Sequence, residues 1–341
     1  MKKILVTGGA GYIGSHTVVA LIEAHYTPII IDDFSNSRRE VLEQIKELTG
    51  KEIVLHEGDV ADANFLTNVF NNEKEISGVI HFAAHKAVGE SVEKPLKYYR
   101  NNLNGLMSLL EVMEQQGVTP LVFSSSATVY GAPDSNPITE NAQIKASESP
   151  YGSTKIIGEQ IIKDLTKSGA RVSAVTLRYF NPIGAHKSGK IGELPLGIPN
   201  NLLPYLTQVA AGKREKLTVY GNDYDTSDGT CIRDYLHVVD LANAHIAALE
   251  HLSKQEAPFY DTFNVGTGNG TTVLELIHLF EKVTGIKLNY EIGPKRKGDV
   301  PACYADVQKI KNILSWEAGL TLEDALRDAW RWEEELNKVT S

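Results

Sequence analysis

The sequence predicts an α/β protein with a doubly wound parallel sheet and a smaller C-terminal substrate-binding domain. Two observations support this fold class. Strand-like and helix-like patterns alternate over the first half of the chain, and a glycine cluster stands between the first strand and the first helix. Strands that are joined by helices pair in parallel through right-handed crossovers, which leaves helices on both faces of the sheet.

The predicted strands are short apolar runs, as expected for strands that are buried on both faces. They lie at 4–7, 28–32, 53–55, 78–82, 121–123 and 172–177. The helical patterns between them lie at about 15–25, 40–48, 95–116 and 151–168. The last of these helices has clear ends, because Ser149 suits the N-cap, Pro150 the first helical position and Gly169 the end.

The glycine cluster follows the first strand directly. Gly8, Gly11 and Gly14 are evenly spaced, and small residues at this spacing let the backbone approach a pyrophosphate at the N-terminus of the next helix. Asp32 ends the second strand, where its carboxylate is placed to bind the ribose hydroxyls of NAD and to repel the 2′-phosphate of NADP. The pattern therefore predicts a Rossmann-type NAD site, and a purely structural glycine turn is the alternative.

The regular alternation ends at Asn181, where Gly, Pro and Asn become frequent. We therefore predict an NAD-binding domain at 1–180 and a substrate-binding domain at 181–341. Helical and strand-like patterns within 235–265 indicate that this later segment returns to the first domain.

The composition excludes several classes of protein. The chain has 341 residues, a formal net charge of −9 and 42% hydrophobic residues, which is typical of a soluble globular protein. An acidic chain does not favour nucleic acid or an anionic membrane as its main partner. The two cysteines, Cys231 and Cys303, are too few for a disulfide framework and lack metal-ligand spacing, so we expect no metal and a reducing, cytoplasmic location. The N-terminal apolar run is too short for a signal peptide, and no stretch reaches the ~20 apolar residues of a membrane span.

A possible acid–base site follows the fifth strand. Ser126 closes a run of three serines at the carboxyl end of that strand, and Tyr151 and Lys155 share one face of the next helix. Lowering the pKa of a tyrosine from ~10 to ~7 needs about 4 kcal/mol, which one cation at ~4 Å supplies at an effective dielectric of about 20. Lys155 and the positive nicotinamide ring are two such cations. We therefore predict Tyr151 as the base, Lys155 as its activator and Ser126 as a clamp on the same substrate oxygen, with an ordinary surface pair as the alternative.

Over nearly its whole length the chain resembles the extended short-chain dehydrogenase/reductase family. The segments that carry the resemblance are TGGAGYIGSHT, EGDV, HFAAHKAVGESVEKP, FSSSATVYG, SPYGSTK, LRYFNPIGAH, GIPNNLLPY, GNDYDTSDGTCIRDYLHVVDLA and GDVPACYAD. The match is closest to the branch that epimerises UDP-hexoses at C4. It implies a reversible reaction through a 4-keto sugar in galactose and nucleotide-sugar metabolism, with tightly bound NAD that is regenerated in each turnover. It also implies a homodimer formed through the helices at 95–116 and 151–168.

The resemblance also implies the residues of the site. The cofactor contacts, which lie in the glycine loop and at strand ends, would be Gly8, Gly11, Tyr12, Ile13, Gly14, Asp32, Asn36, Ser37, Asp59, Val60, Phe82, Ala83, Ala84, Lys86, Asn101, Ser126, Tyr151, Lys155 and Phe180. The UDP-sugar contacts would be Lys86, Ser126, Tyr151, Asn181, Asn201, Leu202, Tyr220, Arg233, Arg296, Asp299 and Cys303. Guanidinium groups suit a pyrophosphate, since they donate in bidentate fashion. Each arginine taken alone could instead be a solvated surface charge.

Cys303 is the main departure from the family pattern. Members that are restricted to unacetylated sugars carry a tyrosine at this position. A cysteine is much smaller and leaves room for a 2-acetamido group, so the resemblance implies added activity on UDP-GlcNAc and UDP-GalNAc. The alternative is that Cys303 is a packed small residue without this role.

Three rival functions remain. A nucleotide-sugar 4,6-dehydratase needs an acidic pair just after the strand-five Ser or Thr, but Ala127 and Thr128 follow Ser126 here. A dehydrogenase that releases NADH is a second enzyme candidate. A non-enzymatic NAD-binding regulator is the candidate from another class, and it would tolerate the loss of Tyr151 or Lys155, both of which are present.

Overall fold

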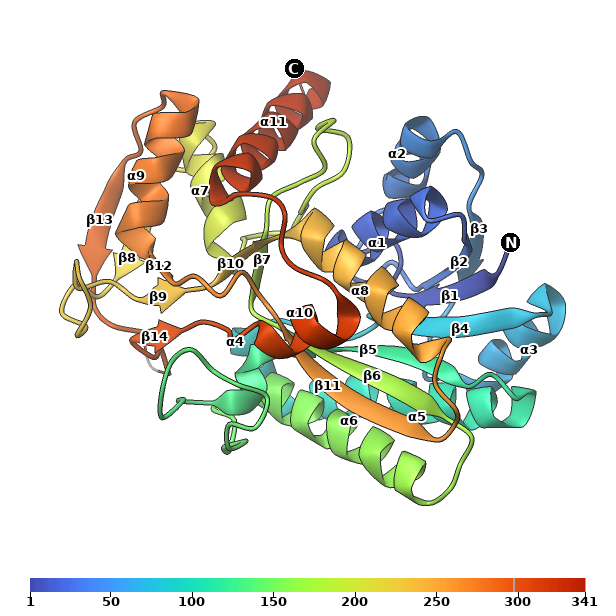
Figure 1. Ribbon diagram of the computed structural model, residues 1–341. Coiled ribbons are helices and arrows are strands. Elements are labelled where there is room, and N and C mark those ends of the chain that lie inside the picture. The colour runs from blue at the N-terminus through green and yellow to red at the C-terminus, as the bar shows by residue number, and fades with distance from the viewer. Residues whose placement is uncertain (297, 341) are drawn as a thin grey trace.

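The computed structural model describes residues 1–296 and 298–340. Within them, a seven-stranded parallel sheet has the order β11-β6-β5-β4-β1-β2-β3 (Figure 1), which confirms the predicted doubly wound fold class. Its strands are β1 (Lys3–Thr7), β2 (Thr27–Asp32), β3 (Val54–Glu57), β4 (Ile76–His81), β5 (Pro120–Ser126), β6 (Ser173–Tyr179) and β11 (Phe259–Val265).

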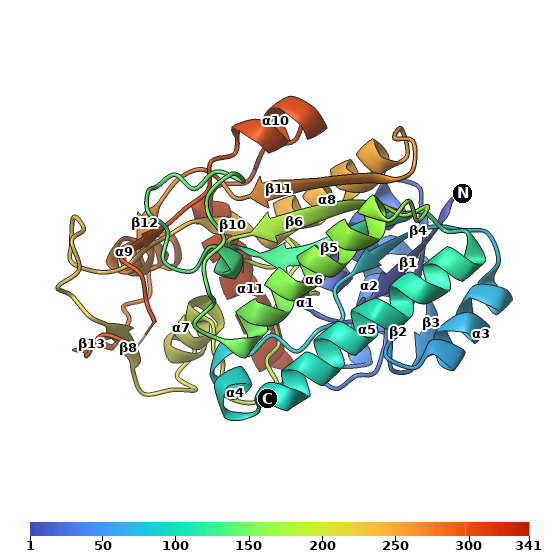
Figure 2. The same cartoon turned by 90° about the horizontal axis from the view of Figure 1, so that it is seen from below.

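Helices cover both faces of this sheet, and each face has its own apolar core. The helices against one face are α1 (Tyr12–Glu23), α2 (Glu40–Thr49), α8 (Val238–Leu252) and α10 (Gln308–Leu314). The helices against the other are α3 (Ala63–Glu73), α5 (Pro95–Gln116) and α6 (Pro150–Lys167), of which α5 and α6 run side by side in Figure 2. We call the sheet and these helices the sheet region.

A second group of elements packs beside the carboxyl ends of the strands, at the left of Figure 1. Its helices are α7 (Leu202–Ala210), α9 (Val273–Thr284) and α11 (Leu322–Thr340), which share an apolar core. Its strands are short: β7 (Asn181–Ile183), β8 (Leu217–Tyr220), β9 (Ile232–Arg233), β10 (Tyr235–His237), β12 (Thr271–Thr272), β13 (Tyr290–Gly293) and β14 (Ala302–Cys303). We call this group the short-strand region.

The chain passes between the two regions more than once. After β7 to β10 it returns to the sheet region, where α8 packs against α1 and β11 pairs in parallel with β6. It then leaves again for β12 and α9. Repeated crossing places residues that are far apart in the sequence on opposite sides of one junction.

The helix that carries Tyr151 begins as its sequence predicts. Ser149 is the N-cap, its hydroxyl oxygen accepts a hydrogen bond from the Gly152 backbone N–H at 3.2 Å, and Pro150 takes the first turn. Gly169, just beyond the helix, has a φ of 91° that favours glycine. Of the helices within residues 1–296 and 298–340, none combines the length and the apolar character that a membrane crossing requires.

Candidate active site

The glycine loop between β1 and α1 is packed too tightly to accept side chains. Gly8 has a φ of 70°, and a Cβ added to it would lie 2.8 Å from the backbone nitrogen of Ala83. A Cβ added to Gly14 would lie 2.2 Å from the Gly8 carbonyl oxygen. The loop thus leaves bare backbone at the N-terminus of α1, as a dinucleotide pyrophosphate requires.

Asp32 is buried at the end of β2 and faces this loop. Its carboxylate accepts hydrogen bonds from the Ala10 N–H at 2.9 Å, the Phe34 N–H at 3.0 Å and the Ser37 hydroxyl at 2.7 Å. Burial raises the pKa of Asp32, and these hydrogen bonds oppose the rise. A carboxylate fixed in this way retains acceptor capacity for ribose hydroxyls, so the residues present fit NAD.

Apart from Asn101, which lies in α5, the remaining residues predicted to contact the cofactor lie in the segments that follow the strands. Tyr12 and Ile13 begin α1, Asn36 and Ser37 follow β2, Asp59 and Val60 follow β3, Phe82, Ala83, Ala84 and Lys86 follow β4, Asn101 lies in α5 and Phe180 follows β6. The carboxyl ends of parallel strands share one edge of the sheet, so the fold gathers these segments around the glycine loop. Asn36 and Asp59 are exposed there, whereas Val60 and Phe180 are buried.

The three predicted catalytic residues come together between β5 and α6. Tyr151 and Lys155 are 8% and 4% exposed, and Ser126 is equally buried at the end of β5. The Lys155 Nζ donates a hydrogen bond to the Ser124 carbonyl oxygen at 2.7 Å and lies 5.9 Å from the centre of the Tyr151 ring. The lysine is therefore fixed beside the tyrosine rather than free to move.

Burial works against the charged form of both groups. Burial raises the pKa of Tyr151 to about 12, and a hydrogen bond with Ser126 opposes this rise. Burial lowers the pKa of Lys155 to about 8, and the negative charge of Glu159 opposes this fall. A further positive charge beside the tyrosine ring is needed before it becomes a base near neutral pH.

The predicted phosphate ligands lie across the junction in the short-strand region. The Asp299 carboxylate lies 3.5 Å from the Arg233 guanidinium and accepts hydrogen bonds from Arg296 at 3.0 and 3.1 Å. The Arg296 guanidinium also stacks 5.4 Å from the centre of the Tyr220 ring. Two guanidinium groups thus converge on one carboxylate.

Cys303 lies next to this arginine cluster. In the strand pair β14–β9 it is opposite Arg233, and its side chain packs against the apolar cluster that contains Phe180 and Ala127. Burial raises the pKa of the Cys303 thiol to about 11, so the group is neutral at physiological pH. The residue therefore behaves as a small apolar side chain between Arg233 and the segment after Ser126.

Two acidic residues near the site were not predicted. The Glu193 carboxylate accepts hydrogen bonds from Lys86 at 3.1 Å and from Asn201 at 2.8 Å, and so joins the two regions. Glu193 lies in a loop whose local pattern carries no signal for this contact. Glu159 is buried one helical turn beyond Lys155, and the repeated spacing of Tyr151, Lys155 and Glu159 on α6 was a signal that could have been used.

The other substrate residues predicted from sequence line the same junction. Asn181 begins β7 and is exposed, and Leu202 begins α7 directly after Asn201. Within residues 1–296 and 298–340, no group of three or more His, Cys, Asp and Glu side chains is arranged to hold a metal ion.

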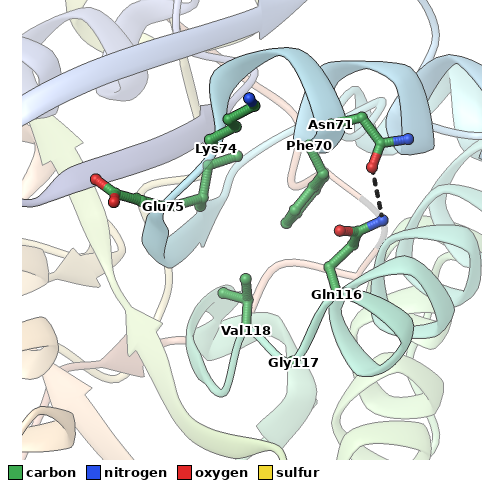
Figure 3. Close-up of a pocket in the computed structure, with 8 residues that line it drawn as sticks. Phe70, Asn71, Lys74, Glu75, Gln116, Gly117 and Val118 are labelled. Carbon is green, nitrogen blue, oxygen red and sulfur yellow. Dashed lines mark hydrogen bonds between the residues drawn. The ribbon is translucent and has the colours of Figure 1, made fainter.

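A hollow of about 400 Å³ lies at the opposite edge of the sheet, where β4 begins and α3 and α5 end (Figure 3). Its lining includes Lys74 and Glu75, and the Gln116 amide donates a hydrogen bond to Asn71 at 3.2 Å. None of the predicted catalytic residues reaches it, because they lie at the carboxyl ends of the strands. The candidate active site is therefore at the carboxyl ends of the strands, and this hollow is not part of it.

Comparisons with known proteins agree with this geometry. A family model described as GDP-mannose 4,6 dehydratase matches residues 5–329. The chain is 53% identical to the UDP-glucose 4-epimerase of Bacillus subtilis over 330 residues, which are 97% of this chain and 96% of that protein. It is 51% identical to the UDP-glucose 4-epimerase of Homo sapiens over 340 residues, which are 98% of this chain and 97% of that protein.

Solved structures resemble the whole molecule. The UDP-glucose 4-epimerase of Stenotrophomonas maltophila, crystallised with NAD and formylated UDP-arabinopyranose, superposes with a TM-score of 0.96 at 45% identity, over 99% of this chain and 100% of that one. The enzyme of Bifidobacterium longum, in complex with NAD⁺ and UDP, gives a TM-score of 0.93 at 46% identity, over 98% of each chain.

Proposed function

The chain belongs to the wider family described by the GDP-mannose 4,6 dehydratase model and, within it, to the UDP-glucose 4-epimerases, and we propose that it interconverts UDP-glucose and UDP-galactose with NAD as cofactor. The observation that carries the proposal is the meeting of Tyr151, Lys155 and Ser126 at the carboxyl ends of the strands, beside the bare glycine loop and the buried Asp32. This arrangement places an acid–base group next to a dinucleotide cradle.

When bound, NAD would supply the hydride chemistry, in which a hydride leaves C4 as the proton leaves O4 and returns to the opposite face of the sugar. Tyr151 accepts the O4 proton at its phenolic oxygen and later returns it. Ser126 holds the same substrate oxygen through its hydroxyl group, and Lys155 stays beside the tyrosine because the Ser124 carbonyl anchors its Nζ. The sugar passes through a 4-keto form and turns about its phosphate linkage before the proton returns.

The electrostatic requirement can be estimated. Lowering the pKa of Tyr151 from about 12 to ~7 needs about 7 kcal/mol. A cation at the 5.9 Å that separates the Lys155 Nζ from the Tyr151 ring centre contributes about 3 kcal/mol at an effective dielectric of about 20, and a second cation at ~4 Å would contribute roughly 4 kcal/mol. Lys155 is one of them and the oxidised nicotinamide is the other. Neither cation alone lowers the pKa of Tyr151 to ~7. Tyr151 therefore acts as a base only when oxidised NAD is bound.

We assign the pyrophosphate to Arg233 and Arg296. Both guanidinium groups are already gathered by Asp299, and the exchange of this carboxylate for phosphate oxygens keeps their charges balanced. The 4-keto sugar has to rotate during the reaction. The site must therefore bind the nucleotide firmly and the hexose loosely. The other residues that the family resemblance implies would complete the cofactor and sugar contacts.

The dehydratase alternative fails on its acid–base groups. After Ser126 the 3₁₀ turn at Ala127–Tyr130 contains a buried alanine and a threonine, and no carboxylic acid. Elimination of water from a 4-keto sugar needs an added acid and base at that place, so epimerisation is the reaction that these residues support.

The proposal extends to N-acetylated sugars through Cys303. Its small side chain lies between Arg233 and the segment after Ser126, where a tyrosine would occupy more of the space beside the sugar. A Cys303→Tyr variant should lose activity on UDP-GalNAc and retain it on UDP-galactose. Equal loss of both activities would show that Cys303 only packs.

We also propose a cytoplasmic homodimer. Exposed apolar side chains gather on α4 (Val88–Glu93), α5 and α6, and they are Val92, Leu96, Met107 and Ile157. A second copy that covers these helices would remove this apolar surface from water. Light scattering of the purified protein tests the dimer, and a monomeric mass at micromolar concentration contradicts it.

The decisive experiment for the function is an assay without added NAD. Purified protein is incubated separately with UDP-galactose and UDP-GalNAc, and the products are identified. We expect UDP-glucose from the first substrate and no net accumulation of NADH. Net NADH would indicate a dehydrogenase, and the absence of any product in the presence of added NAD would rule out the epimerase.

A further inference from the structure

A buried ion pair lies directly behind the candidate active site. The Arg178 guanidinium on β6 donates hydrogen bonds to both Glu159 carboxylate oxygens, at 2.6, 3.0 and 3.2 Å, and both side chains are almost completely buried. Removing two charges from water costs several kcal/mol per ion, and an apolar pair of the same size is often as stable. The pair therefore calls for an explanation beyond stability.

The contacts of this pair lead to the segments that carry the site. The Ser125 hydroxyl, adjacent to Ser126, donates a hydrogen bond to Glu159 at 2.5 Å. Arg178 donates a hydrogen bond to the Tyr130 hydroxyl at 3.0 Å, in the turn that follows Ser126. On α6, Glu159 is one turn beyond Lys155 on the same buried face. The pair thus contacts the Ser126 segment from one side and the lysine helix from the other.

The charges around Lys155 are few. The titratable groups that interact with Lys155 or with its neighbour Tyr151 are Glu159 on α6, His81 on β4, Tyr179 on β6 and Tyr98 on α5. Behind them, Arg178 on β6 contacts Glu159, and His245 on α8 contacts Ser124. Burial lowers the pKa of His81 to about 3 and that of His245 to about 4, so both are neutral. Of these groups, Glu159 is the negative charge and Arg178 is its counter-ion on the far side.

We propose that Glu159 is a positioning residue that keeps Lys155 protonated and fixes the Ser126 segment from behind, with Arg178 as its partner. This role rests on the proposed epimerase function, because it acts through Lys155 and Ser126 on the tyrosine base. The carboxylate also opposes the lowering by burial of the pKa of Lys155.

The test variant is Glu159→Gln, which removes the charge and keeps the shape. Without the carboxylate the pKa of Lys155 falls further below about 8, so the lysine loses its proton at a lower pH and Tyr151 loses a cation. We expect the alkaline limb of the kcat profile to move down by at least about one pH unit, which is about a fivefold loss of kcat at pH 8 and approaches about tenfold at higher pH. A lower kcat with an unmoved pH profile would mean a structural role only and would overturn the proposal.

A second readout does not use turnover. Ionisation of Tyr151 is followed by the phenolate absorbance of the NAD-loaded protein, with the NAD-loaded Tyr151→Phe protein subtracted. In Glu159→Gln the pKa of Tyr151 should rise, because its neighbouring lysine is neutral more often. An unchanged titration contradicts the role of Glu159 whether or not UDP-sugars are turned over. Failure of the wild-type protein to epimerise would contradict the proposed function instead.

Two further variants complete the design. Glu333 is a buried acid in the short-strand region that pairs with Lys213 and Thr207, and Glu333→Gln should reduce stability without moving the pH profile. The double variant Glu159→Gln/Arg178→Met leaves no unpaired buried charge, so it serves where the single variant does not fold. In the double variant the pKa of Tyr151 should rise by less than in Glu159→Gln. An unchanged pKa of Tyr151 in the double variant also overturns the proposal.

Discussion

Tyr151 and Lys155 in the sheet region are almost fully buried on an 18-residue helix, whereas the Arg296 side chain in the short-strand region is 58% exposed and lies on a loop. In the first pair, Lys155 is fixed by the Ser124 backbone carbonyl and lies over the Phe123 ring. The second depends on an aromatic ring and a single carboxylate. The comparison shows that the predicted proton-transfer residues are held more rigidly than the exposed phosphate ligand. Proton transfer needs fixed distances, and a grip on phosphate tolerates movement because charge attraction is long-ranged.

Three buried histidines of the sheet region lead to the largest expected effect. His16, His81 and His245 are buried in the sheet region, and burial lowers their pKa values to about 3, 3 and 4. In the unfolded chain these groups titrate near 6.5, so folding is favoured above that pH and the advantage is lost as the pH falls. At pH 5 the loss is about 2 kcal/mol per histidine.

Urea unfolding at pH 7 and pH 5 checks this effect. We expect stability to fall by several kcal/mol, reduced by buried carboxyls such as Asp234 and Asp240, whose raised pKa values act in the opposite direction. Hydrogen exchange should show the loss in the sheet region, because His16, His81 and His245 lie there. Equal stability at both pH values would contradict the neutral, buried histidines.

The second prediction removes the base from the rigid site. Tyr151→Phe deletes only the phenolic oxygen, so the fold and the arginine cluster should remain while kcat falls by about 10³-fold. Binding of UDP, measured by calorimetry, should be nearly unchanged because the nucleotide contacts lie in the other region. A loss of UDP affinity equal to the loss of rate would contradict this division of labour.

The sequence was more informative about the sheet region than about the short-strand region. Buried strands such as β1 leave continuous apolar runs, and the spacing of Tyr151 and Lys155 on α6 is a local pattern. Strands β9 and β14 have two residues each, which is too short for any period to appear. The contact of Glu193 with Lys86 depends on a turn of the fold that no local pattern encodes.

The third prediction compares Arg233 and Arg296, the two arginines of the short-strand region. Arg233 is mostly buried on β9 and Arg296 is exposed. Arg233→Gln should raise KM for UDP-galactose about 30-fold, since hydrogen bonds to charged groups contribute about 2 kcal/mol. Arg296→Gln should raise it only about threefold, because solvent screens its charge. Steady-state kinetics with kcat unchanged in both variants would support the assignment, and an equal rise in KM would refute the ranking.

The smallest expected effect uses matched helix caps, one in each region. The Ser149 hydroxyl accepts a hydrogen bond from Gly152 at the start of α6, and the Thr272 hydroxyl accepts one from Glu275 at the start of α9. Ser149→Ala should cost about 1 kcal/mol of stability, and Thr272→Ala about 2–3 kcal/mol, because the Thr272 hydroxyl also donates a hydrogen bond to the Asp228 carboxylate. Only Ser149→Ala should also lower kcat, because Tyr151 is in the first turn that this cap holds. If Thr272→Ala lowers kcat as much under conditions where both variants stay folded, the proton-transfer site is not confined to the sheet region, and the contrast between a rigid catalytic part and an adaptable binding part fails.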